Sequence, residues 1–300
     1  TWFDPGTRAA RIEQELTRLT RDGGVTYEHM QALQLDTHSV LADEILPSLD
    51  AAWTAAQTDP ALAMYRDDAS LAALYTQLRQ WDRRMDRAST GAPVFEGFAH
   101  FFALQCLGDD FNLLFDAVLT REPVYILKLL SLTVNRRFPM AERYLQGGRD
   151  VLALRALAAT RDWIVRRFGS IEPAQHTWAM FHRSRSVPSF SPPGPFETEA
   201  VATDGSIGTV NVSQAVFMEG GTPRQFHESR AGAAYRMVVG FNEDGTPSAR
   251  VNFPRGNSGD PTSRWWANTH EDWVAGRYRA LAFSRQAVVA DMQERSMIMP

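Results

Sequence analysis

The sequence predicts an α+β fold, with a helical part over residues 1–185 and a strand-rich part with a C-terminal helix over residues 186–300. Three observations support this prediction. Apolar residues recur at helical spacing through most of the first part. Apolar and polar residues alternate only after Ser184. A segment rich in Pro and Ser, residues 186–195, separates the two patterns.

The predicted helices begin and end at recognisable signals. The first is predicted to start at Asp4-Pro5, with Asp as the N-cap and Pro at the first helical position, and to end at Gly23-Gly24. Thr26 is predicted to cap a second helix that carries apolar residues to Ile45. Because proline lacks an amide hydrogen, Pro47 is expected to end or kink this helix.

Four further helical stretches precede Ser184. Ser70 is predicted to open a helix whose apolar stripe ends at Trp81. The other three stretches are Val94–Phe115, Val124–Val134 and Arg149–Phe168. Cys106, the single cysteine, lies in the first of these and is interpreted as a buried free thiol, with a catalytic cysteine as the alternative.

The second part is predicted to contain a hairpin and a closing helix. Residues 248–253 alternate in polarity, residues 235–241 form the preceding strand, and the turn-forming residues 242–245 lie between them. Ala249, Val251 and Phe253 are expected to face the interior. A short helix is predicted from the Ser284 cap to about residue 295.

Composition and motifs exclude several functions. The formal net charge of -4 gives no reason to expect a nucleic-acid partner, and no apolar run approaches the roughly 20 residues that span a bilayer. The seven histidines show no metal-ligand spacing. Ser258 lacks the strand–turn–helix context of a nucleophile elbow, so a solvated loop is predicted. His182 and His227 are interpreted as polar surface residues or hydrogen-bonded residues rather than bases.

The chain begins Thr1-Trp2, without an initiator Met or a signal-peptide pattern. We therefore expect either an upstream segment that was removed or a start inside a longer polypeptide. N-terminal Thr is a known type of nucleophile. Thr1 nevertheless lies three residues before the predicted helix cap at Asp4, with no strand to present it, so we do not expect it to be catalytic.

Eight short motifs follow one another along the chain. They are Arg11-Ile12, Gln34-x-Asp36, Leu78 to Trp81-Asp82, Thr177-Trp178 with His182, Thr209-Val210-Asn211, Ala233 to Val239, Gly256 to Pro261, and Trp273-x-x-Gly276-Arg277-Tyr278-Arg279. Their fixed order resembles the penicillin acylase family, which includes penicillin, cephalosporin and acyl-homoserine-lactone acylases. The resemblance covers essentially the whole chain and is strongest from residue 209 to residue 284. Asn257 and the Arg264-Trp265-Trp266 run depart from the family pattern, which leaves the subfamily open.

The resemblance implies part of an N-terminal-nucleophile hydrolase with an αββα fold, in which both regions of this chain belong to one acylase domain. Such a precursor cuts itself and exposes a Ser whose own amine acts as the base. Backbone amides and an Asn stabilise the oxyanion. In register, the nucleophile, the oxyanion Asn and a calcium-binding Asp all precede Trp2. A helix Arg that helps to shape the site falls on Arg11, which alone would read as a surface ion pair with Glu15.

The resemblance therefore predicts the C-terminal portion of a large (beta) subunit that is inactive by itself. The complete enzyme would cleave the linear amide of penicillin-like or N-acyl-homoserine-lactone substrates in the periplasm or outside the cell. Expected partners are the small subunit and the N-terminal part of the large subunit, with no cofactor in this chain and a structural calcium in the complete enzyme. Two alternatives stay open: a non-catalytic binding or scaffold remnant of an acylase, and an unrelated helical binding protein.

Overall fold

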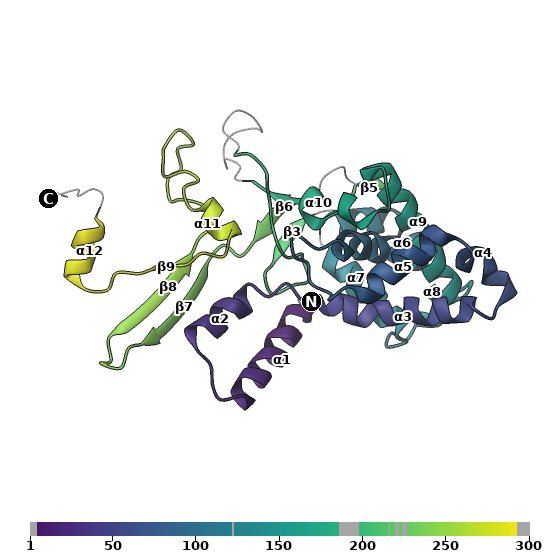
Figure 1. Ribbon diagram of the computed structural model, residues 1–300, viewed down its shortest axis with the longest axis horizontal. Helices are drawn as coiled ribbons and strands as arrows, with labels where there is room; N and C mark the ends of the chain where they lie inside the picture. Colours follow the sequence, from purple (N-terminus) through teal and green to yellow (C-terminus); the bar gives the residue numbers. More distant parts are fainter. Residues whose placement is uncertain are drawn as a thin grey trace.

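The computed structural model describes residues 5–121, 123–185, 198–215, 217–219, 222–223 and 227–292. Most helices form a bundle at one end of an elongated molecule, and the longest strands form a hairpin toward the other end (Figure 1). The described chain is therefore α+β, as predicted. The predicted Asp4 cap, the Pro/Ser-rich segment 186–195 and residue 295 lie outside the described residues.

The helices are α1 (Thr7–Arg21), α2 (Tyr27–Gln34), α3 (Val40–Ala56), α4 (Ala63–Arg66), α5 (Ala69–Gln80), α6 (Gly91–Arg121), α7 (Pro123–Val134), α8 (Ala141–Tyr144), α9 (Arg149–Phe168), α10 (Trp178–Phe181), α11 (His270–Val274) and α12 (Arg285–Asp291). Two 3₁₀ turns, Pro60–Leu62 and Pro173–Gln175, connect them. The predicted stretches in α6, α7 and α9 are confirmed.

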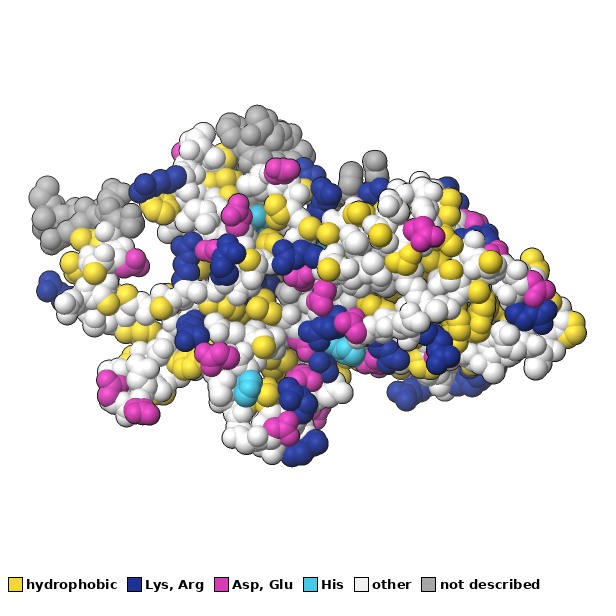
Figure 2. Space-filling view, in the orientation of Figure 1, with side chains coloured by type: hydrophobic (Ala, Val, Ile, Leu, Met, Phe, Trp, Pro, Cys, Tyr) yellow, Lys and Arg dark blue, Asp and Glu magenta, His cyan; other side chains and the backbone are white. Residues whose placement is uncertain are grey.

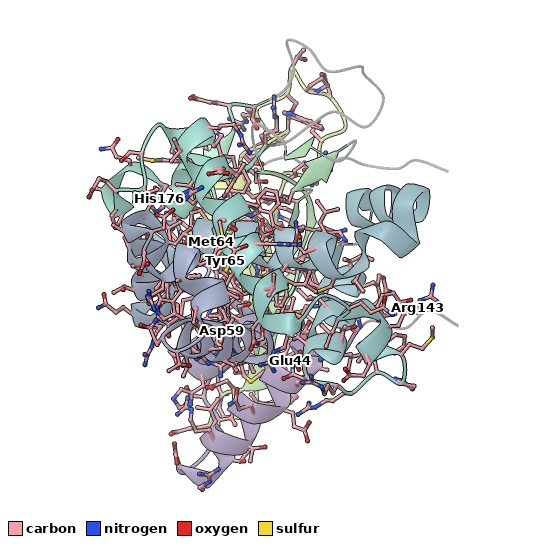
Figure 3. All side chains as sticks on the ribbon, turned by 90° about the vertical axis from the view of Figure 1, so that its right-hand side faces the viewer. Glu44, Asp59, Met64, Tyr65, Arg143 and His176 are labelled. Atoms are coloured by element: carbon pink, nitrogen blue, oxygen red, sulfur yellow. The ribbon has the colours of Figure 1, made fainter. Side chains whose placement is uncertain are left out.

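The bundle is built around α6, which packs against α5, α7 and α9, while α3 packs against α7 and α9. Its centre is aromatic: Phe95, Phe98 and Phe102 of α6 are almost completely buried. At the α3–α7 contact, Lys128 Nζ lies 2.7 Å from a carboxylate oxygen of Glu44, which is labelled in the end-on view of Figure 3. Cys106 is buried, as predicted, and burial raises the pKa of its thiol to about 12.

Two helix starts differ from the prediction. Helix α1 begins at Thr7 with Gly6 as its N-cap at φ 79°, so Pro5 precedes the cap instead of following it. Helix α5 is capped by Asp68 rather than opened by Ser70, because one Asp68 oxygen accepts from the amides of both Ser70 and Leu71. The Thr26 cap of α2 is confirmed, since its hydroxyl accepts from the His29 amide at 3.2 Å.

The predicted second helix is in fact two helices, α2 and α3. Pro47 does not lie at the break between them, and α3 continues beyond it. The break falls between Gln34 and Val40, where the Asp36 carboxylate accepts from the His38 amide at 2.7 Å and Ser39 caps α3. This segment pairs with residues 83–85, which gives its backbone groups partners outside a helix. Pro47 lies inside α3, and its neighbours Leu46 and Ser48 are buried.

The strands form three small sheets. The first has the order β2-β1-β6-β3, from β1 (His182–Ser184), β2 (Val201–Ala202), β3 (Ser213–Ala215) and β6 (His227–Gly232). The second pairs β4 (Met218–Glu219) with β5 (Thr222–Pro223). The third has the order β7-β8-β9, from β7 (Arg236–Phe241), β8 (Pro247–Asn252) and β9 (Arg279–Ala280).

The β7–β8 hairpin is confirmed, with Arg236 opposite Asn252 and Phe241 opposite Pro247. Its predicted pattern of burial is right only in part. Ala249 and Val251 are buried, whereas Phe253 lies beyond the strand and is 38% exposed. Asn252, expected on the polar side, is buried, because it is held by side-chain hydrogen bonds that no alternation pattern contains.

The start of the C-terminal helix is also confirmed, since Ser284 caps α12 by accepting from the Ala287 amide, but the helix ends at Asp291, before the predicted end at about residue 295. Helices α1 and α2 lie beside the hairpin rather than inside the bundle (Figure 1), and α2 contacts β7. No helix in the described part of the chain is both long enough and apolar enough to cross a bilayer.

Candidate functional site

A network of hydrogen bonds joins residues from five of the eight motifs singled out in the sequence. It runs from α1 through the turn after α2 and the segment 209–211 to the hairpin and α11. These elements meet on the side of the bundle where the chain passes to the third sheet (Figure 1). Each link is a side-chain or main-chain contact between positions far apart in sequence.

Arg11 is the first member of this network, and its main partner was not foreseen. Its guanidinium donates from Nε to Asp36 at 2.9 Å and places Nη2 2.7 Å from the same oxygen. The side chains of Arg11 and Asp36 are only 12% and 8% exposed. The predicted pair with Glu15 exists, at 3.0 Å, but it is not a surface pair. Arg11 therefore fastens α1 to the turn that follows α2.

Asp36 connects this pair to the strand-rich part. Its carbonyl accepts from the Asn211 amide at 2.8 Å. The Asn211 side-chain oxygen in turn accepts from Arg236 Nη2 at 2.8 Å. The turn before Asn211 is tight, because a Cβ on Gly205, at φ 87°, would lie 1.9 Å from the Asn211 carbonyl oxygen. Glycine is thus required there for the segment to reach Asp36.

Arg236 is the centre of the network. It is 3% exposed, and burial lowers the pKa of its guanidinium. Nη1 donates to the Asn252 side chain at 2.8 Å and to the Trp273 carbonyl at 2.9 Å. The guanidinium also lies 4.6 Å from the centre of the Trp273 ring, at cation–π distance. Among the described residues, its oxygen partners are all neutral.

The network also fixes α2 and the segment after α11. Gln34 donates to the Met237 carbonyl at 2.9 Å and accepts from the Tyr278 hydroxyl at 2.6 Å. Burial raises the pKa of Tyr278 to about 12, so the hydroxyl keeps the proton it donates at neutral pH. Asn252 donates to the carbonyls of Asp272 and Arg277, which closes the network around α11.

A second cluster pairs a histidine with a serine but is closed to solvent. His182 Nε2 lies 2.8 Å from Ser213 Oγ, which lies 3.0 Å from the Thr203 hydroxyl. Trp178 stacks on the His182 ring at 4.6 Å, and burial lowers the pKa of His182 to about 3. A general base needs access and a pKa near the working pH, so this pair is structural. The prediction of a hydrogen-bonded His182 is confirmed, and the His227 side chain lies outside the described part.

The remaining candidates carry no chemistry. Ser258 lies in an irregular loop and bonds to the nearby Asp260 backbone, which confirms the loop prediction. Trp81 ends α5 and packs against Gly91, where an added Cβ would lie 2.4 Å from the indole. No group of three or more His, Cys, Asp or Glu residues in the described ranges could hold a metal ion.

Sequence reasoning assigned only Arg11 of this network to the site. Arg236 stood in a motif without a role of its own, and Asn252 stood in none. A signal was present, because counting back from the turn at 242–245 places the two residues opposite each other at the open end of the hairpin. An Arg opposite an Asn in an apolar strand pair indicates a buried hydrogen bond rather than a solvated face. What the count cannot give is the third partner, Asn211.

Comparison with known proteins finds similarity over almost the whole chain. The family model described as penicillin amidase matches residues 1–290. Two curated relatives are the acyl-homoserine lactone acylases PvdQ of Pseudomonas syringae pv. syringae (strain B728a) and of Pseudomonas syringae pv. tomato (strain ATCC BAA-871 / DC3000). Each is 24% identical over 290 residues, which is 95% of this chain and 32% of the relative. The chain thus spans about a third of the length of these relatives.

Proposed function

This chain belongs to the penicillin amidase family, and we propose that it is the C-terminal portion of the large subunit of an acylase that hydrolyses a linear amide. The family match over residues 1–290 and the greater length of the relatives support this assignment. The small sheets of this chain would then be completed in an αββα arrangement by segments outside it.

One observation carries the proposal. Residues of motifs that lie as far apart as Arg11 and Tyr278 meet in one buried network, although nothing in their spacing requires them to meet. A chain that shared the family motifs by chance would have no reason to join them through side-chain contacts. The network also favours a working scaffold over an unrelated helical binding protein.

Arg11 is the residue that we propose as this chain's contribution to the active site. Its bonds to Asp36 set where α1 lies, and a helix placed next to a reaction centre shapes that centre. In this role Arg11 positions neighbouring groups and does not itself transfer a proton, since a guanidinium stays charged. The nucleophile Ser, its amine and the oxyanion donors would come from the preceding segments of the enzyme.

The substrates that we propose are N-acyl-homoserine lactones or penicillin-like amides, and the relatives named for the former favour them. Amide hydrolysis would release a carboxylic acid and an amine. We also propose that the enzyme works in the periplasm or outside the cell. We also place a structural calcium of the complete enzyme in the preceding segments, where the family resemblance puts the calcium-binding Asp.

Activity measurements on two preparations test the proposal. The purified 300-residue chain should not release acid from a chromogenic phenylacetyl amide or from an N-acyl-homoserine lactone, because we place the nucleophile Ser and its amine base in the preceding segments. The same chain produced with the preceding segments should release it. Turnover by the isolated chain would contradict the assignment. An inactive complete protein whose preceding sequence lacks a Ser-led strand would favour the non-catalytic remnant.

A further inference from the structure

Arg236 is a buried cation whose partners in the described ranges carry no charge. Elsewhere, basic and acidic side chains lie next to one another at several places on the visible face (Figure 2), whereas Arg236 is only 3% exposed. Its guanidinium donates to two amide side chains and one main-chain carbonyl. An apolar side chain would avoid the free-energy cost of a buried charge. The groups that Arg236 joins therefore explain its presence better than stability does.

These groups lie on two sides of the guanidinium. Nη1 binds the third sheet and α11, through the Asn252 side chain at 2.8 Å and the Trp273 carbonyl at 2.9 Å. Asn252 is itself held by two further main-chain carbonyls. Nη2 binds the Asn211 side chain at 2.8 Å, in the segment just before β3. The third sheet and α11 thus form a fixed base, and Arg236 ties Asn211 to it.

Asn211 joins Arg236 to Arg11 through two further hydrogen bonds. The Asn211 amide donates to the Asp36 carbonyl at 2.8 Å, and the Asp36 carboxylate accepts from Arg11 Nε at 2.9 Å. Asn211 and Asp36 are 8% and 7% exposed, so little water competes for these bonds. The turn around Asp36 also pairs with residues 83–85. Loss of Arg236 is therefore expected to displace Asp36 and Arg11 without releasing them.

We propose that Arg236 is a positioning residue of the acylase, which holds Arg11 in place through Asn211 and Asp36. The proposal rests on the proposed function, because it requires that Arg11 contributes to the active site. Arg236 contacts no substrate in this role and acts only through Arg11. A displacement of about 1 Å far from the reacting atoms can lower a rate about 100-fold, so such a link is measurable in kcat.

The alternative is that Arg236 only stabilises the third sheet. Both roles predict a less stable protein when Arg236 is replaced, so stability alone does not separate them. They differ in the turnover of the folded enzyme. A purely structural residue changes how much enzyme is folded, whereas a positioning residue changes kcat for each folded molecule. The kinetics are therefore compared at equal concentrations of folded enzyme.

The first variant is Arg236→Lys, in the chain produced with the preceding segments. It should lower kcat at least about fivefold with less than about a twofold change in KM, because lysine keeps the charge but cannot hold partners on both sides. Lys128→Met breaks the ion pair to Glu44 in the bundle, so it is the control for lost stability and should leave kcat unchanged. Circular dichroism measures the folded fraction. Equal kcat losses in the two variants, or none in Arg236→Lys, would overturn the proposal.

Variants of Asn211 test the route. Asn211→Ala removes the oxygen that accepts from Arg236 and should lower kcat as much as Arg236→Lys does. Asn211→Asp keeps an acceptor at the same position and should recover most of the lost kcat, since a carboxylate accepts from a guanidinium. A wild-type kcat in Asn211→Ala would show that the link to Arg11 does not run through Asn211 and would overturn the proposal.

A double-mutant cycle with Arg11 separates this proposal from the proposed function. If Arg236 acts through Arg11, Arg236→Lys should lower kcat less than about twofold in the Arg11→Ala background. Losses that multiply would overturn the positioning role and leave the proposed function standing. An unchanged kcat in Arg11→Ala alone would remove Arg11 from the site, and the role of Arg236 with it. A complete wild-type protein that hydrolyses no amide would overturn the proposed function itself.

Discussion

At the scale of single residues, the buried arginines determine how the chain's distant parts are joined. Arg236 binds Asn211, Asn252 and Trp273, all outside its own strand, and Arg11 binds Asp36 together with Glu15 of its own helix. A planar guanidinium can do this because its donors point in several fixed directions. Lysine, with one point charge, could hold one such partner but not the set. The two positions are therefore expected to tolerate lysine poorly, for geometric reasons rather than reasons of charge.

Arg11 gives the sharpest prediction at this scale. In the complete acylase, Arg11→Ala should lower kcat by about tenfold or more with a smaller change in KM, because displacement of α1 disturbs the reacting geometry. It should also reduce stability, since it leaves Asp36 in a largely buried place with fewer partners, at a cost that approaches 3–5 kcal/mol. Kinetics and thermal unfolding of the same preparation measure both effects.

Two further variants separate these effects. Asp36→Asn weakens the same pair and serves as the control for stability, whereas Arg11→Lys keeps the charge but loses the forked geometry. We expect Arg11→Lys to recover more stability than kcat. If Asp36→Asn and Arg11→Ala lost kcat equally, Arg11 would act only by holding Asp36. Unchanged kinetics in Arg11→Ala would remove Arg11 from the site.

Part of this site could be predicted from the sequence. The resemblance to a family singled out Arg11, but its spacing in the helix predicted only Glu15 as a partner. Helical periodicity predicts contacts between residues three or four positions apart and no contacts to other elements. The Asp36 contact depends on how α1 folds back over the turn after α2. Asn211 and Arg236 were recognised as parts of motifs, yet their contact joins segments whose relative position no periodicity specifies.

At the scale of elements, predictions held where local signals act alone. The Thr26 and Ser284 caps and the hairpin turn depend on a few adjacent residues, and all three are confirmed. The misplaced starts of α1 and α5 also have local caps, Gly6 and Asp68, whereas the misplaced break between α2 and α3 depends on distant partners. The break at residues 35–39 is stabilised by pairing with residues 83–85, and Pro47 is tolerated in α3 because the bundle holds the helix on both sides of it.

The start of α5 gives a test at this scale. Asp68→Ala should destabilise the protein by about 1 kcal/mol or more, because the N-cap bonds to Ser70 and Leu71 are lost together with the ion pair to Arg161. Ser70→Ala should change the stability by no more than about 0.5 kcal/mol. Chemical denaturation measures both. Asp68→Asn keeps the cap and weakens the ion pair, so its value should fall between them. A larger loss in Ser70→Ala would restore Ser70 as the cap.

At the scale of the whole molecule, buried titratable groups set how stability depends on pH. Burial lowers the pKa of His100 and His176 to about 4 and that of His182 to about 3, from 6.5. The unfolded state therefore binds more protons below pH 6.5, and stability falls as the pH drops. Burial raises the pKa of Glu96 from 4.5 to about 8, so its contribution is lost as the pH rises toward 8.

These opposing shifts predict a maximum of stability near pH 6.5, since below it the three histidines outweigh Glu96, and above it Glu96, whose window runs from pH 4.5 to about 8, acts nearly alone. Thermal unfolding between pH 4 and pH 8 should show the midpoint falling on both sides, more steeply toward acid. Glu96→Gln should remove the decline on the alkaline side, while Glu243→Gln, at an exposed turn position, should leave it. An unchanged alkaline decline in Glu96→Gln would show that Glu96 is already ionised in the folded protein.

The way in which α2 is attached has a consequence for the order of folding. Its contacts to Met237, Ser248 and Tyr278 span 203, 221 and 244 positions of the chain. On a ribosome, α1 and α2 therefore emerge before α3 to α12 but find these partners only after nearly all of those later residues have been made. The bundle from α3 to α10 can close on itself earlier, because its contacts are more local. Helix α2 is thus made before the bundle and reaches its final place after it.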